Sequence, residues 1–126
     1  MATLDQQRAG HAWERARSAK REFPEKDFDK YRNLAKGAPA LVMGSGLMSA
    51  LAFWQSRGEK PAERLVGDLL GWMADRRLVS SRQFAEAMPA MTKQSSANYL
   101  AATDEALALL RWLRQCADAV AKAPGA

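Results

Sequence analysis

Side chains capable of catalysis are few in this chain and lie far apart in the sequence. His11 is the only histidine and Cys116 the only cysteine, so a zinc site would need carboxylates from other parts of the chain to join them. We expect His11 to be a surface or helix-edge residue and Cys116 to be a small, buried packing residue. No metal or other cofactor is expected.

Two short segments resemble parts of catalytic motifs, but the neighbouring residues that complete those motifs are missing. Gly44-Ser45-Gly46 lacks the first glycine of G-x-S-x-G, because Met43 stands there, and no Gly-Lys-Ser/Thr follows. Glu22 and Glu25 have the E-x-x-E spacing of magnesium-dependent nucleotide hydrolases, but Pro24 separates them and no second E-x-x-E or E-x-x-D follows. The sequence therefore predicts a protein that is not an enzyme, with such a hydrolase as the alternative.

Basic and aromatic side chains are the remaining candidates for function. The formal net charge is +5 and the pI is about 9.7, which mildly favours a polyanionic partner, and arginine and lysine bind phosphates without a special motif. A solvated surface is the alternative. If the first two helices lie side by side, they form one basic patch, whose candidate residues are Arg8, Arg15, Arg17, Arg32 and Lys36.

The chain has four tryptophans, which could stack on bases or pack in a core. Trp13, Trp54 and Trp72 fall on apolar helical stripes, so we expect them in the core. Trp112 extends the apolar arc of the last helix to one side. The candidate residues for a partner interface are Trp112, Arg111 and Arg114.

The composition predicts an all-α fold. Hydrophobic residues make up 48% and charged residues 26% of the 126 residues, which is typical of one globular domain. Isoleucine is absent and helix-forming residues dominate. We expect a single-domain helical bundle of about five to six helices over residues 1–126. The predicted helices span residues 4–23, from 27 with a kink or interruption at 37–39, 47–57, from 61, 81–88 and 93–122.

Three local features complete this interpretation. Capping boxes are predicted at Thr3 with Gln6 and at Ser80 with Gln83. Asp68, four residues after Arg64, is expected on the solvent-facing side of its helix. The apolar arc of the last helix is wide enough either for burial against both core and partner or for a central bundle helix.

The expected location is the cytoplasm. One cysteine fits a reducing compartment, no apolar run follows a basic N-terminus, and no apolar stretch approaches the ~20 residues that span a bilayer.

A spaced pattern runs along nearly the whole chain. It comprises Leu4-Asp5-Gln6-Gln7-Arg8-Ala9, Trp13, Tyr31-Arg32, Leu34-Ala35, Pro39-Ala40-Leu41-Val42, Gly46-Leu47, Leu51-Ala52-Phe53, Tyr99-Leu100, Thr103, Glu105-Ala106-Leu107-Ala108-Leu109 and Trp112-Leu113. This pattern resembles the small-subunit family of the Cmr (type III-B) CRISPR effector complex. Ser45 and Cys116 depart from it, at positions where asparagine and phenylalanine are expected.

The resemblance implies a helical protein without nuclease activity. Copies would stack along the other Cmr subunits, help to hold target RNA beside the guide RNA, and serve antiviral defence. The patch from Arg8 to Lys36 would then make weak phosphate contacts with RNA. A helical protein–protein adaptor that binds no nucleic acid is the alternative.

Overall fold

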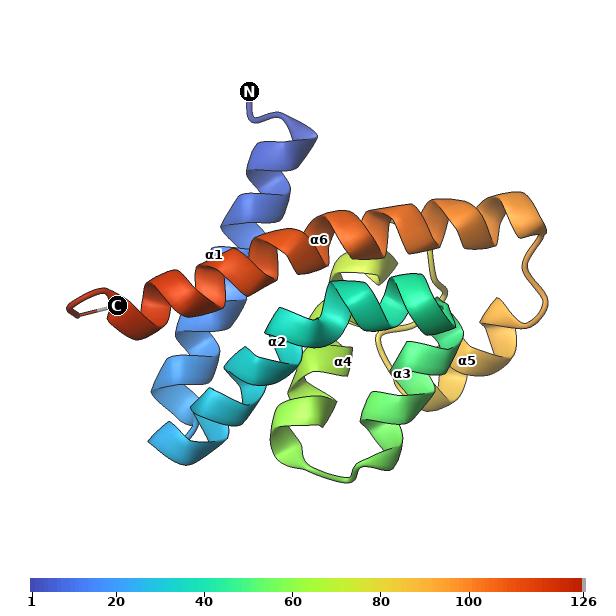
Figure 1. Ribbon diagram of the computed structural model, residues 1–126. Coiled ribbons are helices and arrows are strands. Elements are labelled where there is room, and N and C mark those ends of the chain that lie inside the picture. The colour runs from blue at the N-terminus through green and yellow to red at the C-terminus, as the bar shows by residue number, and fades with distance from the viewer. Residues whose placement is uncertain (126) are drawn as a thin grey trace.

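Six α-helices follow one another in the computed structural model, which describes residues 1–125 (Figure 1). No β-strand occurs within these residues, so the predicted all-α fold is confirmed. The helices are α1 (Leu4–Glu22), α2 (Glu25–Ser45), α3 (Leu47–Ser56), α4 (Lys60–Asp75), α5 (Phe84–Met91) and α6 (Ser96–Lys122).

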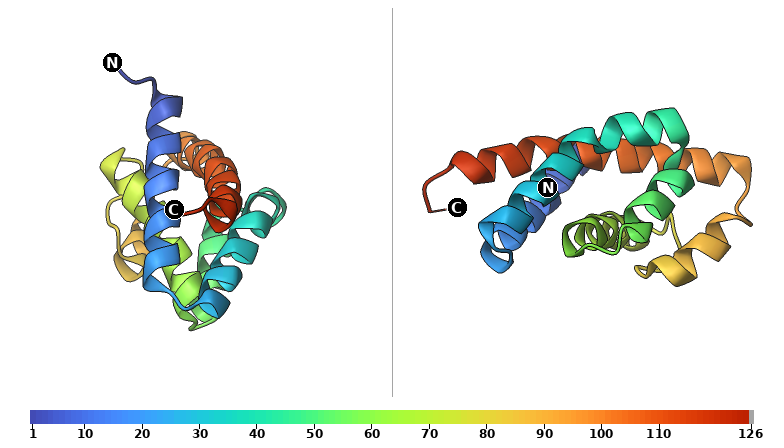
Figure 2. Two further views of the ribbon diagram at one scale, coloured as in Figure 1. Left: turned by 90° about the vertical axis from the view of Figure 1, so that its left-hand side faces the viewer. Right: turned by 60° about the horizontal axis from the view of Figure 1, so that its bottom comes forward.

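The longest helix, α6, has 27 residues and packs against α1, α2 and α4. In Figures 1 and 2, α1 and α2 diverge from the short turn that joins them, and α6 lies across both. The wide apolar arc of α6 is therefore covered by neighbouring helices, so α6 is a central bundle helix. Its buried side chains include Leu109, Leu110, Leu113 and Val120.

All six helices contribute to one hydrophobic core. The largest fully buried side chains are Trp54, Tyr31, Leu47, Leu51, Leu65, Leu69, Leu70, Met73, Leu109, Leu110, Leu113 and Val42. Burying a side chain of this size contributes about 1.5–3 kcal/mol, so the core supplies the main driving force for folding. In the part of the chain that the structure describes, no helix is both long and apolar enough to cross a bilayer.

The helix ends follow local sequence signals. The capping box of α1 is confirmed, because Thr3 Oγ1 accepts from the Gln6 N–H while Gln6 Oε1 accepts from the Thr3 N–H. Ser95 caps α6 by accepting from the backbone N–H of Asn98. Gly46 ends α2 with a φ of 90°, a conformation that glycine adopts at little cost.

Helix α2 bends along its length but is not interrupted (Figure 1), which is one of the two outcomes that the sequence predicts for Pro39. No interruption occurs at residues 37–39, because α2 continues through Pro39 to Ser45. Pro39 removes one backbone donor, while Ala35, Ala38 and Val42 keep the same face of the helix buried. Figure 1 shows α2 changing direction along its length, as expected for a helix that contains proline.

Helix α5 lies three residues further along the chain than the sequence predicts. It begins at Phe84 instead of Ser81 and includes Pro89, a residue that the sequence places at its end. The capping box predicted at Ser80 and Gln83 is absent from α5. Instead, Ser81 Oγ accepts from the Gln83 N–H at 3.0 Å, a local turn that competes with helix.

Two predicted positions on the helix faces are wrong. Trp13, expected in the core, is 37% exposed, because the buried stripe of α1 follows Ala12, Ala16 and Ala19. Asp68, expected on the solvent-facing side of α4, is only 5% exposed.

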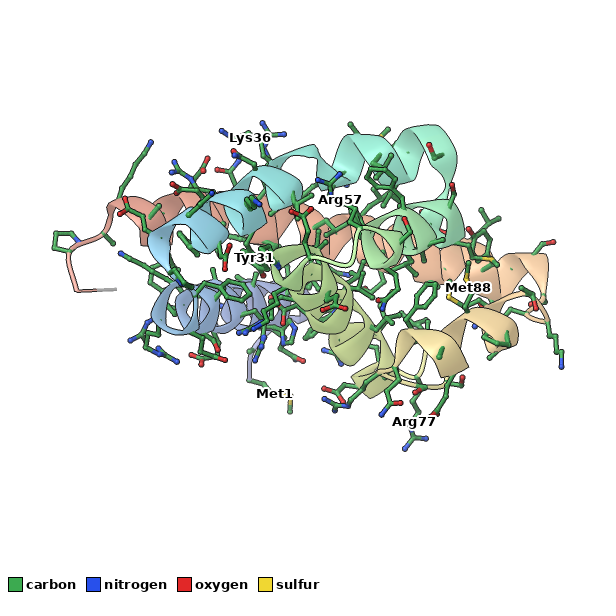
Figure 3. The ribbon with its side chains drawn as sticks, turned by 90° about the horizontal axis from the view of Figure 1, so that it is seen from below. Met1, Tyr31, Lys36, Arg57, Arg77 and Met88 are labelled. Carbon is green, nitrogen blue, oxygen red and sulfur yellow. The ribbon has the colours of Figure 1, made fainter. Side chains whose placement is uncertain are left out.

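The Asp68 carboxylate is paired by side chains from three helices. Its Oδ1 accepts from Arg15 Nε of α1 at 2.6 Å and from Arg64 Nε of α4 at 3.3 Å. Its Oδ2 accepts from the Tyr31 hydroxyl of α2 at 2.6 Å. Burial, with Asp68 beside it, raises the pKa of Tyr31 well above its usual value, so this hydroxyl stays protonated and donates. Figure 3 shows Tyr31 among the helices.

Asp68→Ala is expected to lower the free energy of unfolding by about 3–5 kcal/mol, because Arg15, Arg64 and Tyr31 lose their common partner. Urea denaturation followed by circular dichroism measures this loss. Asp118→Ala, which removes an ion pair with a carboxylate side chain 32% exposed, serves as the control and should cost less than about 1 kcal/mol. Equal losses in both variants would contradict the role given to Asp68.

Candidate functional site

Arg8 and Arg15 project from α1 toward carboxylates on other helices. Arg8 Nε and Nη2 donate to the two carboxylate oxygens of Glu105 on α6, at 2.7 and 2.8 Å. Arg15 Nε donates to Asp68, as described above. Charge-assisted pairs of this kind, the bidentate one above all, are among the stronger hydrogen bonds in proteins. The charges of both arginines are therefore largely offset within the folded chain.

The other three candidate RNA-binding residues differ in their pairing. Arg32 Nε of α2 donates to Asp118 of α6 at 2.7 Å. Lys36 is exposed and makes no ion pair within residues 1–125, and Figure 3 shows it on the outer side of α2. Arg17 is half-buried, and its Nε has no hydrogen-bond partner within residues 1–125.

These residues do not gather into one patch. The sequence interpretation required α1 and α2 to lie side by side, but the two helices diverge from the turn that joins them (Figures 1 and 2), and both pack more extensively against α6. The partners of Arg8 and Arg32, Glu105 and Asp118, are separated by roughly 20 Å along α6, at 1.5 Å per residue. Whether any one of these five side chains binds RNA stays a prediction.

Glu105 joins three helices at a second polar centre. Besides the two bonds from Arg8, it accepts a hydrogen bond from Trp72 Nε1 of α4 at 2.9 Å. The Trp72 indole contacts the His11 ring at 5.0 Å between centroids, and the Arg76 guanidinium lies 4.7 Å from the indole centroid. The hydrogen bond from Arg8 is the main cause that lowers the pKa of Glu105.

The three candidate interface residues lie together. Arg111, Trp112 and Arg114 line a groove of about 560 Å³ between α6, α2 and the start of α1. Trp112 Nε1 donates to Asp5 Oδ1 of α1 at 2.9 Å, which fixes the orientation of the indole. The remaining lining residues are Asp5, Pro39, Ala108 and Gln115.

The side chains considered for catalysis are engaged in hydrogen bonds, begin a helix or are buried. Glu22 lies at the end of α1, where it accepts from Ser18 and Arg64, and Glu25 begins the next helix. Cys116 is buried, and burial raises the pKa of its thiol, which makes it a poor nucleophile. Within residues 1–125, no group of three His, Cys, Asp or Glu side chains is placed to hold a metal ion.

Sequence reasoning missed the acidic partners of the basic residues. Asp68, Glu105 and Asp118 lie 53, 97 and 86 positions from the arginines that they bind. Helical periodicity places a residue on a face of its own helix, but it does not tell which face of another helix it meets. The nearest signal is the Arg64–Asp68 spacing, which by itself indicates only a surface pair.

The structure defines a small all-helical protein with a groove on α6 lined by Arg111, Trp112 and Arg114. A family model described as "CRISPR-associated protein (Cas_Cmr5)" matches residues 4–120. The "CRISPR system Cmr subunit Cmr5" of Thermus thermophilus is 33% identical over 123 residues, covering 95% of this chain and 97% of the relative. This chain belongs to the Cmr5 family of CRISPR-associated proteins.

The chain also shares its fold with a solved structure of this family. The X-ray crystal structure of a CRISPR-associated Cmr5 family protein from Thermus thermophilus superposes with a TM-score of 0.78 at 32% identity. The match covers 95% of this chain and 98% of that chain. The family resemblance predicted from the sequence is therefore confirmed.

Glu105→Gln is expected to lower the free energy of unfolding by about 1–3 kcal/mol at pH 7, because Gln cannot form the charged pair with Arg8. The pKa of Glu105 is lowered in the folded state. The wild-type advantage, which is the excess in free energy of unfolding over Glu105→Gln, is therefore fully present above the ordinary carboxyl pKa of 4.5. It disappears as the pH falls through the lower, folded-state pKa. Denaturation at several pH values measures the difference.

The control is Glu14→Gln, which removes an exposed pair with Arg21 at 3.5 Å and should change stability by less than about 1 kcal/mol at any pH. A wild-type advantage over Glu105→Gln that is the same at pH 3 and pH 7 would show that the charge of Glu105 does not stabilise the fold.

Proposed function

We propose that this chain is a non-catalytic small subunit of a type III-B CRISPR (Cmr) ribonucleoprotein complex in the cytoplasm, where it serves antiviral defence. Copies stack along the other Cmr subunits and help to hold target RNA. The observation that carries the proposal is family membership over almost the full length of both chains, together with a TM-score of 0.78 to a family structure.

The surface supports a role in holding RNA without reading its sequence. Within residues 1–125, several cationic side chains are exposed and take part in no ion pair, among them Lys26, Lys36, Arg111 and Arg114. Such groups attract a phosphate backbone and release its counterions on binding. Because these charges are spread over the helical bundle, one copy should bind RNA weakly. Several stacked copies that contact the same RNA bind it more tightly through multivalency.

In the adaptor alternative, the groove beside Trp112 would be the surface that docks another protein. In that case the chain would join the complex through α6 and contribute nothing to RNA affinity. The two functions differ in one measurable respect, namely the effect of the chain on the affinity of the complex for target RNA.

Native mass spectrometry of this chain, mixed with the other Cmr subunits and guide RNA, is expected to show incorporation of more than one copy. Failure of the chain to enter a complex that otherwise assembles normally would contradict the proposed role. If each copy neutralises about two phosphates, the slope of log affinity for target RNA against log salt should steepen by about −1.4 per copy. Titration at several salt concentrations, with the chain present and omitted, measures this change.

A further inference from the structure

The groove beside Trp112 combines an aromatic wall with unpaired positive charge. Arg111 and Arg114 are exposed, and neither makes an ion pair within the described residues. They lie three positions apart on α6, so their side chains leave the same side of the helix. Trp112 lines the groove with them, held through its Nε1–H by Asp5.

Positive charge continues beyond the groove. Lys36 lies one helical turn before Pro39 on α2, and it is close enough to Asp118 to help lower the pKa of that carboxyl, after the stronger effect of the Arg32 hydrogen bond. Asp118 follows Arg114 by one turn of α6. Lys36 therefore lies beyond the Pro39 side of the groove, near the Arg32–Asp118 ion pair.

The pairing of the other arginines favours this groove over the patch predicted from the sequence. Arg8, Arg15 and Arg32 already donate to carboxylates at 2.6–2.7 Å. A phosphate would have to compete with these carboxylates, so binding there recovers only part of the charge attraction. Arg111 and Arg114 have no such competitor within residues 1–125. The one acid in the lining, Asp5, is itself engaged by Trp112 and Arg8.

The lining also favours nucleic acid over a protein partner. Apart from Trp112, its apolar residues are only Pro39 and Ala108. An amphipathic helix that docks in a groove needs pockets lined by larger apolar side chains for its anchor residues. Single-stranded nucleic acid needs an aromatic side chain for stacking and cations along the backbone, and the groove lining supplies Trp112, Arg111 and Arg114.

We propose that this groove holds the target RNA strand, with a base stacked on Trp112 and the adjoining phosphates bound by Arg111 and Arg114. The inference rests on the proposed role in holding RNA and gives that role a site. The side chains earlier considered for a partner interface thus become the RNA contacts, whereas Arg8, Arg15 and Arg32 are held by carboxylates of the chain itself.

The test uses the Cmr complex reconstituted with guide RNA and measures its affinity for target RNA at several salt concentrations. Arg111→Ala with Arg114→Ala is compared with Lys60→Ala with Lys93→Ala. The control lysines are also exposed and unpaired within residues 1–125, so both double variants lose the same charge. We expect the arginine variant to bind about tenfold or more weakly and its salt slope to flatten by about 1.4 per copy, with the lysine variant near wild type.

Trp112→Leu and Trp112→Phe separate stacking from charge. Leu keeps an apolar side chain but removes the aromatic face, so affinity should fall about tenfold with the salt slope unchanged. Phe keeps an aromatic face and loses the N–H bond to Asp5, so binding should stay within about threefold of wild type. Circular dichroism and native mass spectrometry verify folding and incorporation of each variant.

Three results would overturn the inference, and they differ from one another. If omitting the chain leaves RNA affinity unchanged, the proposed RNA role itself fails. If omission weakens binding but the arginine variant matches the lysine variant, RNA is held elsewhere on the chain. If the arginine and Trp112→Leu variants fold but no longer incorporate, the groove is a protein-docking surface.

Discussion

The arrangement of the helices depends on the neutralisation of one buried carboxylate. An ionised aspartate removed from water costs several kcal/mol unless opposite charges and hydrogen bonds replace its hydration. Asp68 obtains them from Arg15 and Arg64 and from the Tyr31 hydroxyl. Because these groups come from α1, α4 and α2, satisfying the carboxylate fixes the positions of three helices at once, and α6 then covers α1 and α2. The same pairing leaves Arg15 little capacity for an external phosphate.

Local signals predicted most of the fold, and they failed where tertiary contacts decide. The capping box at Thr3, the break at Gly46 and the all-helical composition depend on a few neighbouring residues, so they could be predicted from sequence. Pro89 was expected to end α5 but lies inside it, and Pro39, expected to kink or interrupt α2, leaves that helix bent and continuous (Figure 1). One missing backbone hydrogen bond is tolerated where the flanking turns are buried. The starts of α2, α5 and α6 moved by a few residues, as helix boundaries commonly do.

The candidate site was less predictable, because its electrostatics arise from residues distant in sequence. The basic residues could be found by type, but their availability depends on partners that only the fold brings near. Arg8 and Arg32 resemble Arg111 in the sequence and differ from it in the structure, since Glu105 and Asp118 face the first two. Trp13 shows the same limit, because it falls on an apparent apolar stripe yet is exposed. Trp112, predicted to extend the apolar arc of α6 to one side, is partly buried against the core.

The buried thiol gives the chain a practical property. Cys116 is the only cysteine and is shielded, with its pKa raised, so thiol-specific reagents should leave the native chain largely unlabelled. The neighbouring Gln115 is exposed and lines the groove. A Gln115→Cys variant would therefore carry one reactive sulfur at the groove wall, ready for a spin label, a fluorophore or a photocrosslinker. No background cysteine would first have to be removed from the core.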